Sequence, residues 1–296
     1  MKKVIIAGST GFVGKYLIKR FKSFGHNVVT ISRNHADITW EDISGIKEAL
    51  EDADLLINLA GKSVNCRYND TNKAEIFSSR TETTKTLGNA ILQCQNPPKL
   101  WINASTATIY RHAMDRPMTE KNGELGKGFS VEVAQKWEKS IFDFHLHNTR
   151  QVALRMAIVL GADGGVMTPF ENLVKFGLGG KQGDGTQMFS WIHIEDIFQI
   201  IQFVESQKDI EGVINCSAPK PVTNEDFMRT FREVKRIPIG LPSPTWMLKI
   251  GAFIIGTETE LLLKSRWVVP EKLLDNKYQF QFPTIKKALS DIIHSN

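Results

Sequence analysis

The chain has 296 residues, 42% of them hydrophobic and 23% charged, a balance that is typical of globular proteins and excludes a disordered chain. The net charge of +5 suits an acidic partner such as a nucleotide, but no run of five or six Lys or Arg residues occurs, so the pattern does not favour a nucleic-acid-binding protein. The three cysteines Cys66, Cys94 and Cys216 lie far apart without metal or redox spacing, so we predict a cytoplasmic protein with no metal site and no disulfide framework.

Short apolar segments alternate with helix-like segments through the first half of the chain. Buried strands are predicted over residues 4–7, 27–31, 54–59, 100–104 and 152–159, and helices over 14–24, 72–94 and 130–147. Apolar strands that alternate with helices indicate a parallel sheet covered on both faces. The predicted fold class is therefore α/β, with a Rossmann-type, doubly wound parallel sheet.

A glycine-rich segment follows the first predicted strand and opens the first predicted helix. Its residues are Gly8, Ser9, Thr10, Gly11, Phe12, Val13 and Gly14. Small residues let the backbone turn tightly and approach a pyrophosphate, whose charge then meets the free N–H groups and the positive end of the helix. The spacing GxxGxxG differs from the commonest dinucleotide fingerprint, so its strand–turn–helix position is what indicates a dinucleotide site. The alternative is a purely structural glycine turn.

The second predicted strand ends in Ser32 and Arg33. An NAD-binding protein usually has an acidic residue here, which accepts a hydrogen bond from the ribose 2′-hydroxyl. A guanidinium is suited instead to the 2′-phosphate of NADP, and a serine can add a hydrogen bond. Asp37 is the only acid nearby and lies several residues too late. The pattern predicts NADPH as the cofactor, with an exposed and solvated Arg33 as the alternative.

After residue 161 the chain becomes rich in glycine and later in proline, with a predicted strand over 189–194. We expect an NADP-binding Rossmann domain over residues 1–161, rejoined by a strand and helix near 189–216. Residues 162–296 form mainly a smaller C-terminal substrate lobe. The apolar stretch 246–263 contains Lys249, Glu258 and Glu260, so it predicts a covering helix rather than a membrane span.

Further segments resemble a known family. Asn58-Leu59-Ala60-Gly61 after the third strand and the later Trp191-Ile192-His193-Ile194-Glu195-Asp196 resemble the NAD(P)-dependent epimerase/dehydratase group of extended short-chain dehydrogenases/reductases. More narrowly, the chain resembles an atypical subgroup known as "epimerase family protein", which has no settled reaction. Matching segments extend along nearly the whole chain, at residues 79–84, 160–165, 177–180, 189–193, 218–224 and 269–274.

The resemblance implies which residues contact the cofactor. It places Leu59 and Ala60, followed by Gly61, along the adenosine and ribose, and Glu75 and Arg80 on the long helix facing the cofactor. It also places Val159 near the nicotinamide. The alternatives are a salt-bridged surface arginine for Arg80 and core packing for Val159.

The residues that usually transfer the proton in this superfamily are missing. A tyrosine normally transfers it, and a lysine four residues later lowers the tyrosine pKa. Four places after the tyrosines of this chain stand Arg20, Asn72, Met114 and Phe282. If Glu138 is the acid that usually follows on this helix, Ser130 and Ala134 occupy the Tyr and Lys positions.

The turn that orients the substrate is retained. In Ser105-Thr106-Ala107-Thr108-Ile109-Tyr110, Thr106 falls at the orienting position and Tyr110 stands nearby, so these two are the candidate catalytic residues. The alternative is a polar strand end whose hydroxyls are satisfied locally. His193 is expected to brace the loop that enters a helix, and His112 is a further proton-transfer candidate.

Three functional hypotheses follow. The first is an NADPH-dependent oxidoreductase or epimerase that acts on a nucleoside-diphosphate sugar or another small polar molecule with a substituted acid/base. The second is a sensor or regulatory protein that binds NADPH without turnover, which the missing YxxxK pair favours. The third is a nucleic-acid-associated atypical reductase, which the net charge permits. The substrate, the reaction and the oligomeric state stay open, with a homodimer as one option.

Overall fold

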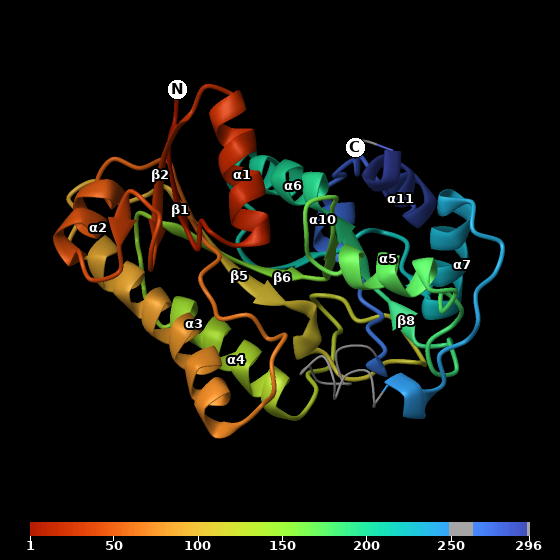
Figure 1. The fold of residues 1–296 in the computed structure, drawn as a ribbon. Coiled ribbons are helices and arrows are strands. Elements are labelled where there is room, and N and C mark those ends of the chain that lie inside the picture. Colours follow the sequence, from red (N-terminus) through yellow and green to blue (C-terminus); the bar gives the residue numbers. More distant parts are fainter. Residues whose placement is uncertain (249–262, 295–296) are drawn as a thin grey trace.

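Seven parallel strands form the central sheet of the protein (Figure 1). The structure is a computed structural model, and it describes residues 1–248 and 263–294. The spatial order of the strands is β10-β6-β5-β4-β1-β2-β3, and every neighbouring pair is parallel. The strands are β1 (Lys3–Ala7), β2 (Asn27–Ser32), β3 (Ile38–Thr39), β4 (Leu55–Asn58), β5 (Leu100–Thr106), β6 (Arg150–Met156) and β10 (Gly212–Cys216). The order reverses between β1 and β4, and ligands of such sheets bind outside the carboxyl ends of the strands at this reversal.

Helices cover both faces of this sheet (Figure 1). One face carries α1 (Phe12–Ser23) and α6 (Ile194–Ser206), and the other carries α2 (Ile43–Leu50), α3 (Asp70–Ile91) and α4 (Phe129–Phe142). Successive residues of a strand point to opposite faces: Val4 and Ile6 pack in the core with α1 and α6, whereas Ile5 and Ala7 pack in the core with α2 and α3. The prediction of a doubly wound Rossmann-type sheet is confirmed.

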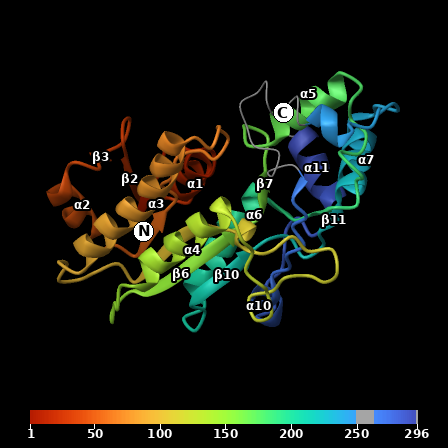
Figure 2. The same ribbon diagram turned by 90° about the horizontal axis from the view of Figure 1, so that it is seen from below.

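A smaller group of elements lies at one end of the molecule, away from α2 and α3 (Figure 2). Its core contains a set of phenylalanines, Phe170, Phe189, Phe227, Phe231 and Phe282. The elements are β7 (Ile158–Leu160), α5 (Met167–Lys175), β8 (Met188–Phe189), β9 (Trp191–His193), β11 (Val222–Thr223), α7 (Asn224–Lys235) and α11 (Ile285–His294). The short helix α10 (Glu271–Asp275) packs instead beside β10, with Leu273 in the core of the large sheet. The domain boundary at residue 161 stays a prediction. Two elements after this residue belong to the larger group: β10 pairs with β6 in the central sheet, and α6 packs on one face of that sheet.

Two predicted strands are wrong in their extent. The strand predicted over 152–159 is two strands, because β6 ends at Met156 and β7 pairs with β9 outside the main sheet. The strand predicted over 189–194 is also divided: β8 pairs antiparallel with β11, β9 pairs with β7, and Ile194 already begins α6. Local alternation could not indicate a change of pairing partner, because the partners lie far away in sequence.

Part of the predicted covering helix over 246–263 lies outside the described residues. Within the residues that are described, no helix is both long enough and apolar enough to cross a membrane.

Candidate functional site

The glycine loop lies at the carboxyl end of β1, at the reversal of strand order. Gly8 has φ +81°, and a Cβ there would stand 2.6 Å from the carbonyl carbon of Leu59. A Cβ on Gly14 would stand 2.5 Å from the Gly8 carbonyl oxygen. Both positions therefore require glycine for the loop to close on β4 and on α1. At Gly11 the nearest such atom is the Gly8 oxygen at 3.4 Å, so the space above Gly11 is open.

This open space faces the first turn of α1. Gly11 is the N-cap residue, no side chain caps the helix, and no acidic residue stands in its first turn. The first N–H groups of a helix have no partner inside the helix and carry partial positive charge. Ser9 Oγ is buried and has no hydrogen-bond partner among the described residues. An orphaned hydroxyl, an uncapped helix N-terminus and a glycine with open space above it fit a pyrophosphate.

A second glycine-rich loop packs on the first. A Cβ on Gly161, Gly164 or Gly165 would stand 2.9–3.1 Å from the ring of Phe12, the first residue of α1. These glycines let the 161–165 loop lie flat against the glycine loop. Val159, at the centre of β7, is half-buried and packs against the core of the large sheet. The structure therefore shows the core packing that was the alternative role for Val159.

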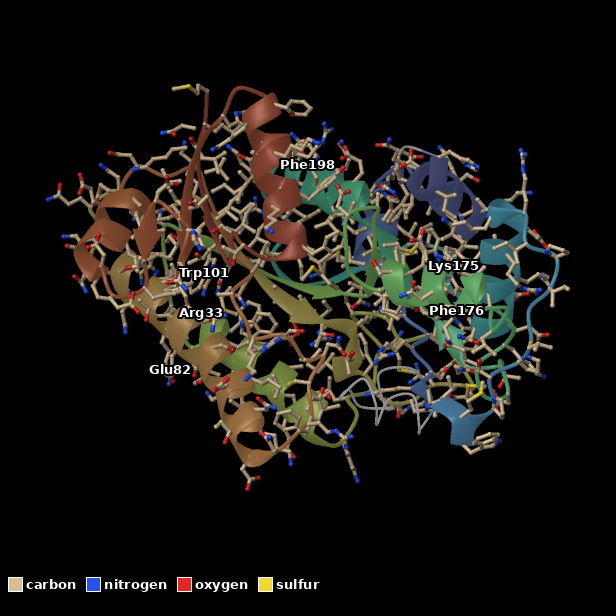
Figure 3. All side chains as sticks on the ribbon, in the orientation of Figure 1. Arg33, Glu82, Trp101, Lys175, Phe176 and Phe198 are labelled. Carbon is tan, nitrogen blue, oxygen red and sulfur yellow. The ribbon has the colours of Figure 1, made fainter. Side chains whose placement is uncertain are left out.

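The end of β2 presents a cation with no carboxylate partner. Arg33 follows β2 directly and is exposed (Figure 3), and no hydrogen bond or ion pair engages its guanidinium within the described chain. Ser32 is buried, and its hydroxyl donates to the Asn34 carbonyl. The nearby Asp37 is occupied, because its carboxylate accepts from the Thr30 amide at 2.8 Å and the Thr30 hydroxyl at 2.7 Å. These bonds lower the pKa of Asp37.

The segment after β4 is held by buried polar groups that the sequence analysis missed. Asn58 donates through Nδ2 to Thr84 of α3 at 3.1 Å and to Asn103 of β5 at 2.7 Å, and its Oδ1 accepts from the Ala60 amide at 3.0 Å. These bonds fix the Leu59–Ala60 backbone against which Gly8 packs. Asparagines inside an apolar strand are the signal that could have found this network.

The two helix residues assigned to the cofactor differ in their surroundings. Glu75 forms an ion pair with Lys62 on the loop after β4. Arg80 lies beneath Gly61, donates to the Ile76 carbonyl at 3.0 Å and stacks over Trp137 at 4.9 Å. Burial lowers the pKa of Arg80 to about 10. No carboxylate pairs with this guanidinium among the described residues, so an anionic ligand would stabilise it.

The turn after β5 is held in place by the C-terminal part of the chain. Thr106 is half-buried, and its Oγ1 accepts from the Thr108 amide at 3.1 Å. Thr108 in turn accepts two hydrogen bonds from distant cations: Lys264 Nζ donates to its carbonyl at 2.9 Å and Arg266 Nε to its hydroxyl at 3.2 Å. Sequence reasoning missed both cations, because nothing local links residues 156 or more positions apart.

Tyr110 lies in the core. It is 2% exposed, its hydroxyl accepts from Arg155 at 2.8 Å, and it lies within donating distance of Asn215 Oδ1 at 2.9 Å. Burial raises the pKa of Tyr110. A hydroxyl enclosed in this way does not reach a substrate, so the geometry gives Tyr110 a structural role in place of the catalytic one considered from the sequence.

The two positions of α4 that align with the missing acid/base pair differ in burial. Ser130 is half-buried near the start of α4, whereas Ala134 is fully buried in an apolar cluster that includes Ile109, Tyr110 and Val268. Ala134 thus belongs to the core in this structure. His193, for its part, accepts the Glu195 amide on Nδ1 at 3.2 Å and so caps α6, which agrees with the bracing role expected for it.

Residues 4–128 match the NAD dependent epimerase/dehydratase family, and residues 243–292 match a domain of unknown function, DUF1731. The epimerase family protein SDR39U1 of Mus musculus is 31% identical, over 98% of this chain and 99% of its own.

Solved structures show the same resemblance. The crystal structure of human epimerase family protein SDR39U1 (isoform 2) with NADPH superposes with a TM-score of 0.89 at 31% identity and covers 99% of both chains. The nucleoside-diphosphate sugar epimerase of Corynebacterium glutamicum superposes with a TM-score of 0.79 at 28% identity, over all of this chain and 59% of its own. Among the described residues, no group of His, Cys, Asp and Glu could hold a metal ion.

Proposed function

The chain belongs to the NAD-dependent epimerase/dehydratase family, and we propose that it is an NADP(H)-binding member that acts on a small polar molecule in the cytoplasm. The observation that carries the proposal is the geometry of the glycine loop. Backbone atoms fill the space beside Gly8 and Gly14, and of the three glycines only Gly11 opens onto the uncapped end of α1. A purely structural turn would need glycine at positions 8 and 14 but not at position 11.

The loop would hold the cofactor pyrophosphate. The N–H groups at Phe12 and Val13 and the buried Ser9 hydroxyl would donate to it. The rest of the dinucleotide would extend along residues on both sides of the reversal of strand order, namely Thr10, Ser32, Arg33, Leu59, Ala60, Gly61, Glu75, Arg80 and Val159.

The choice of NADP over NAD rests on the end of β2. Arg33 is exposed and has no acidic partner among the described residues, and Asp37 is occupied by Thr30. A guanidinium can bind a 2′-phosphate through two charge-assisted hydrogen bonds. The human relative crystallised with NADPH supports the same choice.

Bound NADPH would supply a hydride at the site near Val159 and Thr106. Thr106 accepts the Thr108 amide and keeps its own O–H as a donor toward a substrate. Neither Ser130 nor Ala134 can titrate in the useful range, and Tyr110 is buried. Thr106 is therefore the residue proposed to orient the substrate, and turnover is expected to be slow.

A second candidate is a protein that binds NADPH without turnover, as a sensor. The fully buried Ala134, where the family normally has a lysine, favours it. Mass spectrometry of the small molecules that copurify with the protein tests both candidates. NADP(H) together with a second, polar metabolite would support an enzyme, NADP(H) alone would support a sensor, and purification with neither, coupled to no NADPH binding on addition, would contradict both.

A further inference from the structure

Four large apolar side chains lie exposed on the smaller group of elements. Phe176, at the end of α5, is 76% exposed and is labelled in Figure 3. Ile239, Leu241 and Trp246, which follow α7, are 66%, 59% and 65% exposed. We call these four residues the apolar patch. Single apolar residues are ordinary on a protein surface, but two aromatic and two aliphatic side chains on neighbouring segments indicate a binding surface.

The two segments that carry the apolar patch are held side by side. The Leu241 amide donates to the Gly177 carbonyl at 2.7 Å, and the Leu241 carbonyl accepts from the Gly180 amide at 3.0 Å. The stem of Arg232 packs against Gly240, where a Cβ would stand 2.6 Å from the Arg232 Cδ. A braced backbone therefore presents the exposed side chains.

The backbone after α7 has few free donors. Pro238, Pro242 and Pro244 have no N–H group, and the N–H groups of Leu241 and Ser243 donate to carbonyls of the neighbouring segment. A backbone N–H group without a partner is strongly unfavourable in the apolar part of a bilayer. A segment whose donors are missing or already bonded is therefore suited to contact with a bilayer.

Basic side chains accompany the apolar patch. Residues 172–183 and 234–248 contain no acidic residue and four basic ones, Lys175, Lys181, Lys235 and Arg236. Lys235 is paired with Glu171, whereas the other three are exposed and make no hydrogen bond or ion pair through their side chains within the described chain. Asp184 attracts Lys181 from just beyond the first segment, and the net charge beside the apolar patch stays positive.

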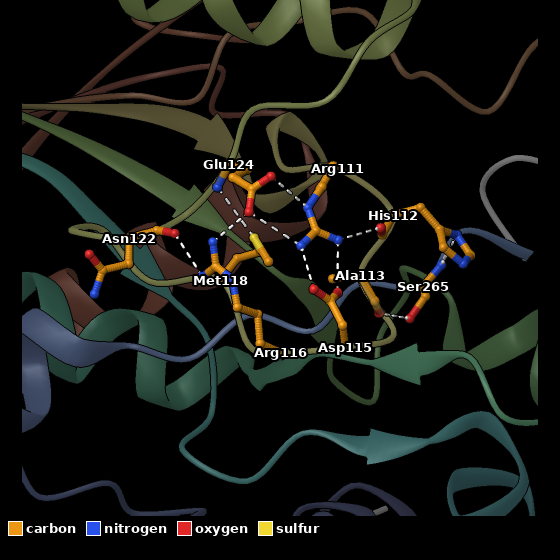
Figure 4. Close-up of polar contacts among 9 residues, drawn as sticks. All are labelled: Arg111, His112, Ala113, Asp115, Arg116, Met118, Asn122, Glu124 and Ser265. Atoms are coloured by element: carbon orange, nitrogen blue, oxygen red, sulfur yellow. Dashed lines mark hydrogen bonds and ion pairs between the residues drawn. The ribbon is translucent and has the colours of Figure 1, made fainter.

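The charged loop after β5 has the opposite arrangement (Figure 4). There Arg111 binds both Asp115 and Glu124, and Arg116 binds Glu124 as well. The carboxylates of that loop thus neutralise its own cations, and it offers little charge to a partner. The unpaired cations beside the apolar patch, in contrast, are available to an anionic surface.

We propose that the apolar patch binds the surface of an anionic phospholipid bilayer. The four apolar side chains would enter the interfacial layer, and Lys175, Lys181 and Arg236 would lie at the lipid phosphates. Aromatic and aliphatic side chains beside lysine and arginine are typical of proteins that lie on a bilayer without crossing it. A second copy of this chain fits less well, because the same basic residues would meet across the contact.

Sedimentation of the full-length protein with vesicles tests the proposal. We expect binding to vesicles of equal parts phosphatidylglycerol and phosphatidylcholine, and about tenfold weaker binding to phosphatidylcholine alone. Phe176→Ser and Leu241→Ser should each weaken binding to the anionic vesicles about fivefold. Leu92→Ser, which removes a leucine that is 60% exposed at the end of α3, should bind as wild type.

The basic residues are tested on the same anionic vesicles. Lys175→Gln combined with Arg236→Gln should weaken binding about tenfold. Lys19→Gln combined with Lys22→Gln, which removes two exposed lysines from α1, should change it less than about twofold. All these side chains are exposed, so each variant should unfold at the same temperature as wild type.

The fluorescence of Trp246 reports the contact itself, as the difference between wild type and Trp246→Phe. We expect acrylamide to quench this emission without vesicles, and brominated phosphatidylcholine in anionic vesicles to quench it in the bound protein. No binding by the wild type, equal binding by wild type and both serine variants, or a Trp246 that acrylamide cannot reach would overturn the proposal. A dimer in sedimentation equilibrium that Phe176→Ser dissociates would also overturn it, because a second copy would then cover the apolar patch.

Discussion

Glu138 binds both Nε and Nη2 of Arg155, at 2.8 and 2.7 Å, and the pair is buried between α4 and β6. The same carboxylate accepts a hydrogen bond from Ser105 at 2.5 Å, one residue before Thr106. Arg155 then reaches Tyr110. On the helix where the family normally has its Tyr and Lys, the buried carboxylate of Glu138 thus holds the strand end that carries Thr106.

Removing one partner of this pair should destabilise the fold. Glu138→Ala leaves the Arg155 guanidinium buried without a counter-charge, which costs about 3–5 kcal/mol of the free energy of unfolding. Urea denaturation measures the loss, and Glu132→Ala on the exposed face of the same helix is the control. The double change Glu138→Ala with Arg155→Met should recover part of the stability. A loss below about 1 kcal/mol in Glu138→Ala would contradict the account.

The glycines of the phosphate loop should separate into two kinds. Gly14→Ala places a Cβ 2.5 Å from a backbone oxygen, so it should lower stability even without cofactor. Gly11→Val should stay folded and lose NADPH binding, because its side chain would fill the open space above the helix N-terminus. Thermal unfolding and NADPH fluorescence distinguish the two. Normal NADPH binding by a folded Gly11→Val would show that the loop is not the site.

Turnover on ordinary sugar-nucleotide epimerase substrates should be very slow or absent, even with saturating NADPH. A poised acid/base typically contributes roughly 10²–10⁴-fold in rate, and this chain has none at the usual helix positions. Any residual activity should fall about tenfold in Thr106→Ala and change little in Ser130→Ala. Fast turnover by the wild type, or an equal loss in both variants, would contradict the role assigned to Thr106.

Rebuilding the missing pair as Ser130→Tyr with Ala134→Lys meets an obstacle that the sequence does not show. Ala134 is fully buried in an apolar cluster, and a lysine there would have to displace that packing or lose its charge. A failure of the rebuilt protein to gain activity would therefore be accompanied by lower stability.

Stability should fall in acid because of His193. Burial lowers its pKa to about 4, against the attraction of Asp291 and Glu195, whereas an unfolded imidazole has a pKa of about 6.5. Between these pH values the imidazole binds a proton in the unfolded chain but not in the folded chain. Stability is therefore lost as the pH falls from 6.5 toward 4. The loss between pH 7 and pH 5 is about 2 kcal/mol.

Urea denaturation at both pH values checks this. In His193→Gln the loss between pH 7 and pH 5 should shrink by that amount, whereas the exposed His145→Gln should behave as wild type. Identical pH profiles for wild type and His193→Gln would refute the assignment.

What the sequence predicted well was local. The strands β1, β2, β4 and β5 depend on short apolar segments whose pattern carries their geometry, and the parallel sheet built on them was predicted correctly, whereas the short edge strand β3 was not predicted. The Asp42-capped helix α2 was missed, because its eight residues carry too little periodicity.

What the sequence could not show depended on distant contacts. Tyr110 is a candidate acid by its position in the turn, yet Arg155 and Asn215, 45 and 105 residues away, enclose its hydroxyl. Lys264 likewise donates to the carbonyl of Thr108, which lies 156 residues away in the sequence. No spacing rule in one sequence links such residues.

Calorimetric titration of the wild type with NADPH and with NADH under the same conditions tests the cofactor assignment. We expect NADPH to bind at least tenfold tighter than NADH, which corresponds to about 1.4 kcal/mol. Arg33→Ala should bring the two affinities within about threefold, and Arg229→Ala, an exposed arginine on α7, should leave the preference unchanged. Equal affinities in the wild type, or a preference that survives Arg33→Ala, would contradict the account.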